Sequence, residues 1–398
     1  MTPARPSAPA RHLTVRTIDA VAHRGFLRGL ADTTGRSASF LQTPGWGAVK
    51  AEWAAESVGW FDGEALVGAG LVLFRRLPRS RRALAYLPEG PVLDWSAYAG
   101  DVAAVLDPLA EHLRTRKAFA VRVGPPVVVH RWAAAAVKAG IADDTVRGLG
   151  ELEPSTTDPG GVTITAGLRS AGWQSQHADG GFAAGQPQFN FQIPLVDADG
   201  GARAEADVLA SMNQLWRRNI KKSAKAGVEV RRGTAEDLAA FHALYVHTAQ
   251  RDHFTPRPLR YFQTMFAALD DADPATGADC EIRLYLAEHE GDLVAATIWI
   301  RSGRHVWYSY GASSTDKREV RGSNAVQWRM ITDAIDAGAH VYDLRGITET
   351  LDAGDSHVGL IQFKVGTGGE AVEFAGEWDL PLNRLLYKGF RLYMSRRG

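Results

Sequence analysis

The sequence predicts two mixed α/β domains in tandem, with mixed sheets, on the basis of three observations. The chain has 398 residues, of which 45% are apolar and 23% are charged, so each of two domains can bury its own core. Strand-like and helix-like patterns alternate along the chain. Both halves repeat one order of elements, a helix, a hairpin, another strand, a long helix and a final strand, which indicates a duplicated fold.

The elements expected in the first half begin with a hairpin. Asp62-Gly63-Glu64 is a turn sequence between two apolar runs. Apolar residues recur at helical spacing after Asp101, and the next apolar run stops at Gly124-Pro125-Pro126. In order, we predict an amphipathic stretch at 41–53, strands at 60–61, 65–74 and 83–87, a helix at 101–114 and a strand at 118–123.

Residues 151–187 differ in composition from the flanking segments, because Gly, Pro, Thr, Ser and Asp replace long apolar runs. We expect a loop-rich segment here, which could carry specificity. An alternating strand at 189–195 and a helix at 207–226 should follow.

After residue 228 a second α/β pattern begins, and Gly291-Asp292 again marks a hairpin turn. No heptad pattern is sustained after Ala226, so no coiled-coil arm is expected. The predicted elements are a strand at 228–231, helices at 235–250 and 257–269, strands at 283–288, 293–301 and 305–310, a helix at 325–337 and a strand at 340–344.

Composition excludes several classes of protein. Cys280 is the one cysteine, so an internal disulfide and a cysteine metal cluster are excluded, and His247, Asp252 and His253 lack zinc-site spacing. No metal site is expected. The 45 basic and 45 acidic residues balance, which argues against a protein that coats nucleic acid, although local basic patches could hold phosphates.

The ends and apolar runs of the chain bear on its location. The first dozen residues contain three prolines and no apolar run typical of a secretory signal, so a frayed tail is expected. The longest apolar stretch, residues 65–74, is far shorter than the roughly 20 residues that span a bilayer. We expect a cytoplasmic protein, either free or peripheral to the inner membrane face.

Segments from residue 39 to about residue 390 resemble, in order, the FemABX family of aminoacyl-tRNA-dependent peptidyltransferases. The resemblance covers nearly the whole chain. Its carriers are Phe40-Leu41-Gln42-Thr43-Pro44-Gly45-Trp46-Gly47-Ala48-Val49-Lys50, Gly90-Pro91-Val92-Leu93-Asp94, Arg217-Arg218-Asn219-Ile220-Lys221-Lys222-Ser223-Ala224-Lys225, Tyr308-Ser309-Tyr310-Gly311-Ala312-Ser313, Tyr342-Asp343-Leu344-Arg345-Gly346-Ile347, Gly359-Leu360-Ile361-Gln362-Phe363-Lys364 and Gly376-Glu377-Trp378-Asp379-Leu380-Pro381.

The resemblance implies two GNAT-like domains in the compact form without an arm. It also implies transfer of a glycine, alanine or serine from aminoacyl-tRNA, as co-substrate and with no other cofactor, to an amine of a lipid-linked or nucleotide-linked muropeptide in peptidoglycan synthesis. We divide the chain into a tail and lead-in at 1–37, a first domain with acceptor-binding loops at 38–195, a second domain at 196–376 and a segment at 377–398 that returns to the first domain.

The resemblance places the family's functional lysine at Lys364, after Phe363, and these two are the predicted catalytic positions. A cation where the tetrahedral oxyanion develops would accelerate acyl transfer. The turn Gly366-Thr367-Gly368-Gly369 follows, and its glycines would let backbone approach a substrate closely. Taken by itself, a lone lysine is more often a solvated surface charge.

Further residues match the family's acceptor contacts. Lys50 and Arg257 match two cations on the acceptor diphosphate, although Arg251 and Arg260 are close enough to replace Arg257 in a shifted alignment. Tyr261 should share the helix face of Arg257. Tyr308 and Tyr310 lie two apart on a strand and should point to the same side; packing roles for these tyrosines remain an alternative.

A basic face on the helix near 211–226 predicts tRNA binding, with a solvated amphipathic helix as the alternative. Met212, Trp216, Ile220 and Ala224 fall opposite that face. The basic residues are Arg217, Arg218, Lys221, Lys222 and Lys225. The loop with Arg75, Arg76, Arg79, Arg81 and Arg82 is equally open to both interpretations.

The identity of the general base stays open. Where several relatives have an acidic residue before a proline, this chain has Gly124, and Asp343 is a weak candidate that is expected to pair with Arg345. The rival functions are a tRNA-dependent peptide ligase of natural-product synthesis, an acyl-CoA N-acyltransferase and an inactive binding protein. Residues 319–324 match the CoA pyrophosphate loop poorly, because the first position is Glu319 and the last is Asn324. The amino acid, the acceptor and the oligomeric state are not determined by the sequence.

Overall fold

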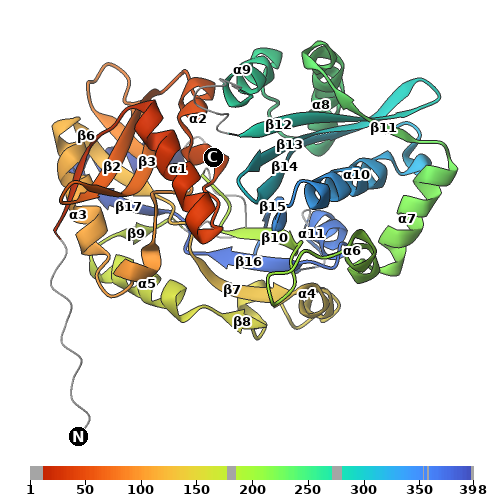
Figure 1. Cartoon of the computed structure of the whole chain (residues 1–398), viewed down its shortest axis with the longest axis horizontal. Helices are drawn as coiled ribbons and strands as arrows, with labels where there is room; N and C mark the ends of the chain where they lie inside the picture. The colour runs from red at the N-terminus through yellow and green to blue at the C-terminus, as the bar shows by residue number, and fades with distance from the viewer. Residues whose placement is uncertain (1–11, 177–184, 271–279, 353, 356–357, 396–398) are drawn as a thin grey trace, which may run out of the picture.

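Two mixed sheets lie side by side along the long axis of the molecule (Figure 1). The computed structural model describes residues 12–176, 185–270, 280–352, 354–355 and 358–395. The tail predicted for the first dozen residues falls almost entirely outside this set. The predicted mixed α/β class is confirmed.

The first sheet contains one parallel pair, β4 and β6, among antiparallel neighbours. Its order is β1-β2-β3-β4-β6-β17-β9, with β5 paired to β3. Its strands are β1 (Leu13–Thr17), β2 (Ala54–Asp62), β3 (Ala65–Arg76), β4 (Ala83–Leu87), β5 (Val92–Leu93), β6 (Ala118–Val123), β9 (Gln174–Ser175) and β17 (Trp378–Pro381). The helices near this sheet are α1 (Ala20–Thr34), α2 (Pro44–Val49), α3 (Ala103–Thr115), α5 (Pro159–Ser170) and α12 (Arg384–Ser395).

The second sheet also contains a parallel pair, β14 and β15. Its order is β11-β12-β13-β14-β15-β10-β16-β7-β8. Its strands are β7 (Val128–Ala133), β8 (Thr156–Thr157), β10 (Phe189–Pro194), β11 (Glu229–Gly233), β12 (Glu281–His289), β13 (Asp292–Ser302), β14 (His305–Ser313), β15 (Val341–Ile347) and β16 (Glu370–Phe374). The helices that accompany it are α4 (Ala134–Ile141), α6 (Glu205–Ser211), α7 (Gln214–Lys225), α8 (Leu238–Asp252), α9 (Leu259–Leu269), α10 (Gly322–Asp336) and α11 (Val358–Val365).

Strand β13 shows why the second sheet is buried on both faces. Trp299 packs into a core with α7, α10 and α11, whereas its neighbours Ile298 and Ile300 pack into a core with α8 and α9. Because successive side chains of a strand point to opposite faces, a nearly continuous apolar run serves both cores.

The core on the α8 and α9 side extends into the first domain. Trp46 of α2 and Leu71 of β3 belong to the same buried cluster as Phe262 of α9 and Ile298 of β13. Burial of apolar surface across the two sheets stabilises their relative orientation. This shared core fixes the seam at which the candidate site lies.

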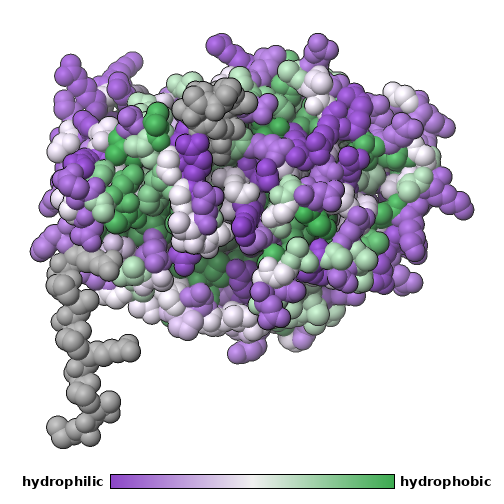
Figure 2. Space-filling view, in the orientation of Figure 1, coloured by the Kyte–Doolittle hydropathy of each residue, from purple (hydrophilic) through white to green (hydrophobic). Residues whose placement is uncertain are grey.

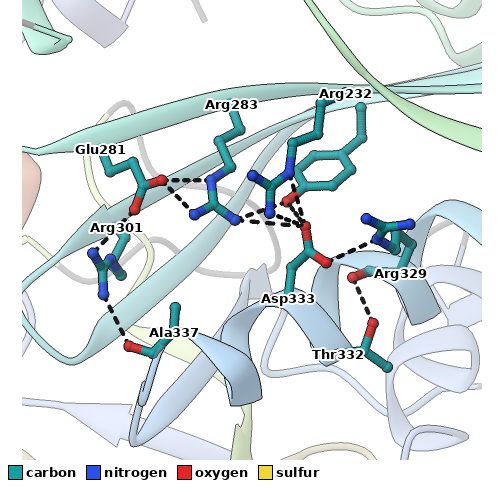
Figure 3. A network of polar contacts seen from close by, with 9 residues as sticks. Arg232, Glu281, Arg283, Arg301, Arg329, Thr332, Asp333 and Ala337 are labelled. Atoms are coloured by element: carbon teal, nitrogen blue, oxygen red, sulfur yellow. Dashed lines mark hydrogen bonds and ion pairs between the residues drawn. The ribbon is translucent and has the colours of Figure 1, made fainter.

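Helix α10 is held to the edge of the second sheet by a charged network around Asp333 (Figure 3). The Asp333 carboxylate accepts hydrogen bonds from Arg232 at 2.7 Å, from Arg329 at 2.8 Å and from the hydroxyl of Tyr285 at 2.5 Å. Arg283 lies 3.5 Å from it and also bonds Glu281 at 2.6 Å. A buried carboxylate requires such partners, because an uncompensated buried charge is strongly destabilising.

The prediction of a loop-rich segment at 151–187 is wrong for residues 159–170, which form α5. Asp158 caps this helix by accepting from the Gly161 N–H, and Pro159 occupies its first position, where a proline fits. Ile164 and Leu168, four residues apart, are buried. The capping and spacing signals were therefore present despite the polar composition.

The predicted helix at 207–226 is two helices, α6 and α7. Met212 and Asn213 between them have extended backbones, and the Asn213 side chain accepts from the Trp216 N–H at 2.9 Å. Asn213 is thus the N-cap of α7, which an apolar periodicity does not reveal.

Segments cross between the two sheets. Residues 128–157, within the span assigned to the first domain, supply β7 and β8 to the second sheet, and β10 lies near its centre. Residues 13–34, assigned to the lead-in, form β1 and α1 of the first domain. Near the other end of the chain, β17 pairs with β6 of the first sheet.

Hydrophilic side chains cover most of the face shown in Figure 2, and the visible apolar side chains gather mainly over the first sheet. Among the described helices, none is long and apolar enough to cross a membrane. The longest have 15 residues, so the described chain contains no coiled-coil arm.

Candidate active site

Lys364 lies in the last turn of α11, and Gly366, Gly368 and Gly369 follow it. The sequence suggested that these glycines admit a substrate, but each faces protein. A Cβ at Gly366 would lie 2.3 Å from the Trp216 ring, one at Gly368 2.0 Å from the Ser211 carbonyl oxygen and one at Gly369 2.1 Å from the Gln192 carbonyl oxygen. The glycines therefore let the turn pack against α7, α6 and β10, and this packing positions Lys364.

The Lys364 side chain is buried, with 4% exposure. Its Nζ donates to the carbonyl oxygens of Gly346 at 2.6 Å and Arg345 at 3.2 Å, at the end of β15. Burial lowers its pKa to about 7; the Asp343 charge opposes this shift, and the Arg345 charge adds to it. A buried amine that titrates near neutral pH is typical of functional sites.

Asp343 is held by side chains of β10 and β14 and by the backbone of its own strand. Its carboxylate accepts from Gln192 at 2.9 Å, from Asn190 at 3.3 Å and from His305 at 3.3 Å, and from the Arg345 backbone N–H at 2.6 Å. Burial acts to raise the pKa of Asp343, but His305 and Arg345 outweigh it and leave the pKa below its usual value. Asp343 is thus an ionised carboxylate that accepts hydrogen bonds at both oxygens and links β10, β14 and β15.

Arg345 joins the two sheets. From the sequence we expected Arg345 to pair with Asp343. Its guanidinium instead donates hydrogen bonds to Glu89 of the first domain at 2.8 Å and to Gln186 at 2.8 Å. Only its backbone N–H reaches Asp343. Arg345 itself has a positive φ of 62°, which is uncommon for a residue other than glycine.

A cavity of about 140 Å³, here called the seam cavity, lies where the two sheets meet. Its lining includes Glu89, Gly124, His305, Asp343 and Glu377. A side chain on Gly124 would approach Glu377 and Glu89, because a Cβ at this position would lie 3.6 and 3.2 Å from their nearest atoms. Position 124 therefore faces the backbone of Glu89 and the side chain of Glu377, and both of these acidic residues line the seam cavity.

Glu377 and Glu89 were not among the site residues predicted from the sequence. Glu377 is buried, accepts from the Tyr86 hydroxyl and the Gln186 N–H, and lies 3.6 Å from Arg122. Burial raises its pKa, against the opposing charge of Arg122. The signal was available, since Glu377 stands in the Gly376-Glu377-Trp378-Asp379 segment that carried the resemblance.

Lys50 and Arg257, far apart in the sequence, flank the ring of Tyr261. The Lys50 Nζ and the Arg257 guanidinium carbon each lie 5.4 Å from its centroid. Burial, followed by the charge of Arg257, lowers the pKa of Lys50. Helix α9 begins at Leu259, so Arg257 precedes it, yet the predicted proximity to Tyr261 is observed.

The alternatives to Arg257 are placed differently. Arg251 bonds Asp252 at 2.7 Å and the Ser313 carbonyl oxygen at 2.9 Å. Arg260 is exposed on α9. Of the three arginines, Arg257 is the one whose guanidinium lies over the Tyr261 ring beside Lys50.

The prediction that Tyr308 and Tyr310 point to the same side is wrong. Tyr310 has a positive φ of 50° and follows an irregularity in the pairing of β13 with β14, which breaks the strict alternation. Tyr308 packs with the core of α7, α10 and α11, whereas Tyr310 packs with that of α8 and α9. The Tyr310 hydroxyl lies 2.9 Å from that of Tyr261, so these two belong together.

A second cavity, of about 230 Å³ and here called the arginine cavity, lies between α12 and strands of the first sheet. Trp53, three residues after Lys50, lines it, as do Arg122 and Glu377. Because Glu377 also lines the seam cavity, one buried carboxylate separates the two spaces. Lys50 and Arg257 line neither cavity, but the Trp53 backbone N–H donates to the Lys50 carbonyl oxygen at 2.8 Å, so Lys50 lies next to a residue of the arginine cavity.

A third cavity, of about 460 Å³ and here called the helix cavity, lies on the other side of α11. Phe363, Trp216 and Arg321 line it, together with the first residues of α10. The Phe363 ring packs 4.8 Å from that of Trp216, whose indole N–H donates to the Phe363 carbonyl. Adjacent residues of α11 therefore face two spaces, with Phe363 toward the helix cavity and Lys364 toward the end of β15.

Four of the five basic residues predicted on α7 are exposed, namely Arg218, Lys221, Lys222 and Lys225. Arg217 is half-buried and donates to the Ala210 carbonyl at 2.9 Å. Trp216 and Ser223 are buried, whereas Ala224, expected on the buried face, is exposed. Asn219 and Leu215 of the same helix line the helix cavity, so the basic face adjoins it.

No group of three or more His, Cys, Asp or Glu side chains in the described residues is arranged to hold a metal ion. Cys280 is buried in the core of α8 and α9.

Two α/β domains in tandem, each built on a mixed sheet with one parallel strand pair, have the tandem GNAT-like fold. Within this class, the chain belongs to the FemAB family, whose model matches residues 32–293 and 279–394.

Relatives of known name support this membership. An alanyltransferase of Weissella viridescens, UDP-N-acetylmuramoylpentapeptide-lysine N(6)-alanyltransferase, is 30% identical over 87% of this chain and 90% of its own length. A lipid II:glycine glycyltransferase of Staphylococcus haemolyticus is 24% identical over 85% of this chain and 88% of its own. The crystal structure of FemX superposes with a TM-score of 0.74 and 20% identity, and covers 94% of this chain and 98% of that one.

Proposed function

We propose that this protein transfers a glycyl, alanyl or seryl group from aminoacyl-tRNA to an amine of a peptidoglycan precursor peptide. The observation that carries the proposal is the buried Lys364 in a chain of the FemAB family. Its neighbour Phe363 lines the helix cavity, and its Nζ bonds the Arg345 and Gly346 carbonyls of β15, the strand that supplies Asp343 to the seam cavity. The names of the relatives in Weissella and Staphylococcus support the acceptor, because both contain a peptidoglycan precursor.

In this proposal Lys50 and Arg257 bind the diphosphate of the acceptor, and its peptide extends through the arginine cavity to the seam cavity. Two cations about one aromatic ring suit a diphosphate, since charge-assisted hydrogen bonds to phosphate are strong and directional. The peptide would extend past Trp53 and Glu377, and its amine would reach the seam cavity. Carboxylates there favour binding of a cationic amine.

The donor occupies the helix cavity. Its lining includes Arg318 and Arg321, and the exposed cations of α7 adjoin it, so RNA phosphates would meet positive charge. The terminal ribose would lie near Phe363, with the ester carbonyl between the donor and acceptor cavities.

The reaction needs one bond made and one broken. The neutral acceptor amine attacks the ester carbonyl, a C–N bond forms, and the carbonyl oxygen becomes an oxyanion near Lys364. Collapse breaks the C–O bond to the ribose, whose oxygen takes up the proton lost by the amine. A protonated Lys364 would stabilise the oxyanion, since a fixed cation in a dry site costs little reorganisation.

Ribonuclease treatment of the donor is expected to abolish transfer to a muropeptide acceptor, as followed by mass spectrometry of the acceptor. Charged tRNA pools supply the donor, and acetyl-CoA in the absence of RNA serves as the alternative acyl source. Robust transfer from acetyl-CoA would show that the acyl-CoA rival is correct. Equal transfer to unrelated peptides that lack the sugar diphosphate would favour a natural-product peptide ligase instead.

The oxyanion role also predicts a pH dependence. Because the pKa of Lys364 is lowered to about 7, its charge is present below pH 7 and is lost as the pH rises through that value. Arginine stays charged at these pH values. The ratio of wild-type to Lys364→Arg kcat/KM for the donor, measured at several pH values, should therefore fall roughly tenfold per pH unit above about pH 7. The ratio cancels ionisation of the acceptor amine, and a flat ratio would contradict a protonated Lys364.

A further inference from the structure

Helix α12 packs against the first sheet through one of its faces. Leu386, Tyr387 and Phe390 form a cluster with Leu84 and Phe119 of β4 and β6, and the rings of Phe390 and Phe119 lie 5.4 Å apart. This inner face accounts for the helix as a structural element of the first domain.

The outer face of α12 is apolar as well. Leu385 is 81% exposed and Leu392 is 56% exposed; because they are seven residues apart, they lie on the same side of the helix. Tyr393, which is 42% exposed, borders this stripe. An outward helix face is normally polar, so large exposed side chains in a row indicate an interaction surface.

Cations surround this apolar stripe. Arg384, Lys388 and Arg391 are exposed on α12. The last two residues of β3 and its link to β4, here called the 75–82 connection, add Arg75, Arg76, Arg79, Arg81 and Arg82. It lies beside α12, because Leu77 packs into the cluster under the helix, and Arg75 and Arg391 line the arginine cavity together.

Acidic residues are absent from both segments. Residues 75–82 and 382–395 contain eight cations and no Asp or Glu, although the whole chain balances 45 basic against 45 acidic residues. Within the described part of the chain, none of the eight is bonded to a carboxylate. The positive charge is therefore concentrated and available to a partner.

We propose that α12 and the 75–82 connection form a docking surface for an anionic lipid bilayer. Exposed leucines, a bordering tyrosine and flanking Lys and Arg are the composition of helices that lie in a membrane interface. Each cation near an anionic bilayer contributes to binding, and the leucines add burial of apolar surface.

Two other occupants fit less well. In a symmetric dimer the same patch meets its own copy, so eight cations would face eight cations at close range. An RNA backbone would use the cations but would leave the Leu385 and Leu392 side chains exposed to water. The bilayer is the partner that satisfies both features.

Docking would also orient the arginine cavity. Phe390, Arg391 and Met394 of α12 line its mouth together with Arg75, and Glu377 at its far end borders the seam cavity. A bilayer against α12 therefore brings lipid headgroups to the opening of this path. The docking surface goes beyond the proposed reaction and is tested without it.

Vesicle co-sedimentation of the full chain tests the proposal. The protein is expected to bind phosphatidylcholine vesicles that contain phosphatidylglycerol, to bind pure phosphatidylcholine poorly, and to be released by high salt. The double variant Leu385→Ser/Leu392→Ser and the triple variant Arg384→Gln/Lys388→Gln/Arg391→Gln should each lower the partition coefficient at least about tenfold.

A matched control removes three charges from another exposed helix, by Arg218→Gln/Lys221→Gln/Lys222→Gln on α7. It should bind vesicles within about twofold of wild type, since electrostatic attraction decays within a Debye length. Thermal melts confirm that each variant is folded. A variant that does not fold is replaced by Leu385→Ser alone, which should leave the core intact because the Leu385 side chain is 81% exposed.

Four results would overturn the docking surface. If the wild-type protein does not bind anionic vesicles, there is no such docking surface. If the α7 control loses vesicle binding to the same extent, the net charge of the protein, and not α12, causes the binding. If sedimentation velocity shows a dimer that Leu385→Ser/Leu392→Ser dissociates, the surface serves self-association. If the α12 variants lose tRNA affinity while vesicle binding stays intact, the surface binds RNA. Loss of transfer activity without loss of vesicle binding would instead bear on the proposed function.

Discussion

Lys364→Met is expected to slow single-turnover transfer by roughly a hundredfold to a thousandfold when both substrates are saturating. A fixed donor aimed at a developing oxyanion is typically worth about 2.7–4 kcal/mol, and its loss appears in the chemical step. Lys364→Arg should retain partial activity at most, because a guanidinium is planar and its charge is displaced. Dissociation constants of donor and acceptor, measured separately, should stay near those of wild type.

The structure offers a competing role for Lys364, since its Nζ bonds the carbonyl oxygens of Arg345 and Gly346 at the end of β15. Thermal stability separates the two roles. Burial lowers the pKa of Lys364 to about 7, so the charged side chain destabilises the folded state relative to the unfolded state. This destabilisation is fully present below pH 7 and disappears as the pH rises toward 10.5, the ordinary pKa of lysine.

At about pH 6 the Lys364→Met variant should therefore melt at the wild-type temperature or above, since lowering a pKa by one corresponds to about 1.4 kcal/mol. The matched control is Lys138→Met, which changes an exposed lysine of α4, a helix that packs against α11. It should leave rate and stability unchanged. A Lys364→Met variant that melts markedly lower, or that transfers at the wild-type rate, would make Lys364 a structural residue.

Lys50→Ala and Arg257→Ala are each expected to raise the acceptor KM with little change in kcat, by about 1.5–3 kcal/mol or roughly 10- to 150-fold. The reason is the loss of a charge-assisted contact to a phosphate group. Both cations lie 5.4 Å from the Tyr261 ring, so one diphosphate can reach both, and the double variant should show coupling rather than simple addition.

Arg260→Ala is the control for this pair. Arg260 is exposed three residues beyond Arg257, on α9, and the change removes the same charge from the same region. Its acceptor KM should stay within about twofold of wild type, because Arg257, and not Arg260, lies over the Tyr261 ring beside Lys50, and salt screens a charge that makes no direct contact. If Arg260→Ala matches Arg257→Ala, the effect comes from the general field and no diphosphate is held at Tyr261.

Several features of the site followed from local sequence patterns. The hairpin around Asp62-Gly63-Glu64 is observed between β2 and β3, because turn residues act over a few positions. The proximity of Lys50 and Arg257 followed from the family resemblance, and the structure brings both to Tyr261. Local sequence missed the break at Asn213 and helix α5, where a capping residue rather than periodicity sets the boundary.

Tyr310 shows where a period-two rule fails. A rule of alternation assumes regular pairing, but the positive φ at Tyr310 and the shifted register of β13 and β14 send its ring to the core opposite that of Tyr308. The hydrogen bond between the hydroxyls of Tyr310 and Tyr261 then depends on α9, which is distant in sequence.

By itself, the sequence determined the mixed α/β class, the family and the positions of Lys364, Lys50 and Arg257, because apolar periodicity and motifs are local properties of the chain. The tertiary structure decided which carboxylates surround the seam cavity and which partner Arg345 takes. Glu89, Arg345 and Glu377 come from separate segments, and they meet because the shared core and the crossing of β7, β10 and β17 bring the two sheets together. No local pattern encodes such contacts, since they depend on the packing of residues hundreds of positions apart.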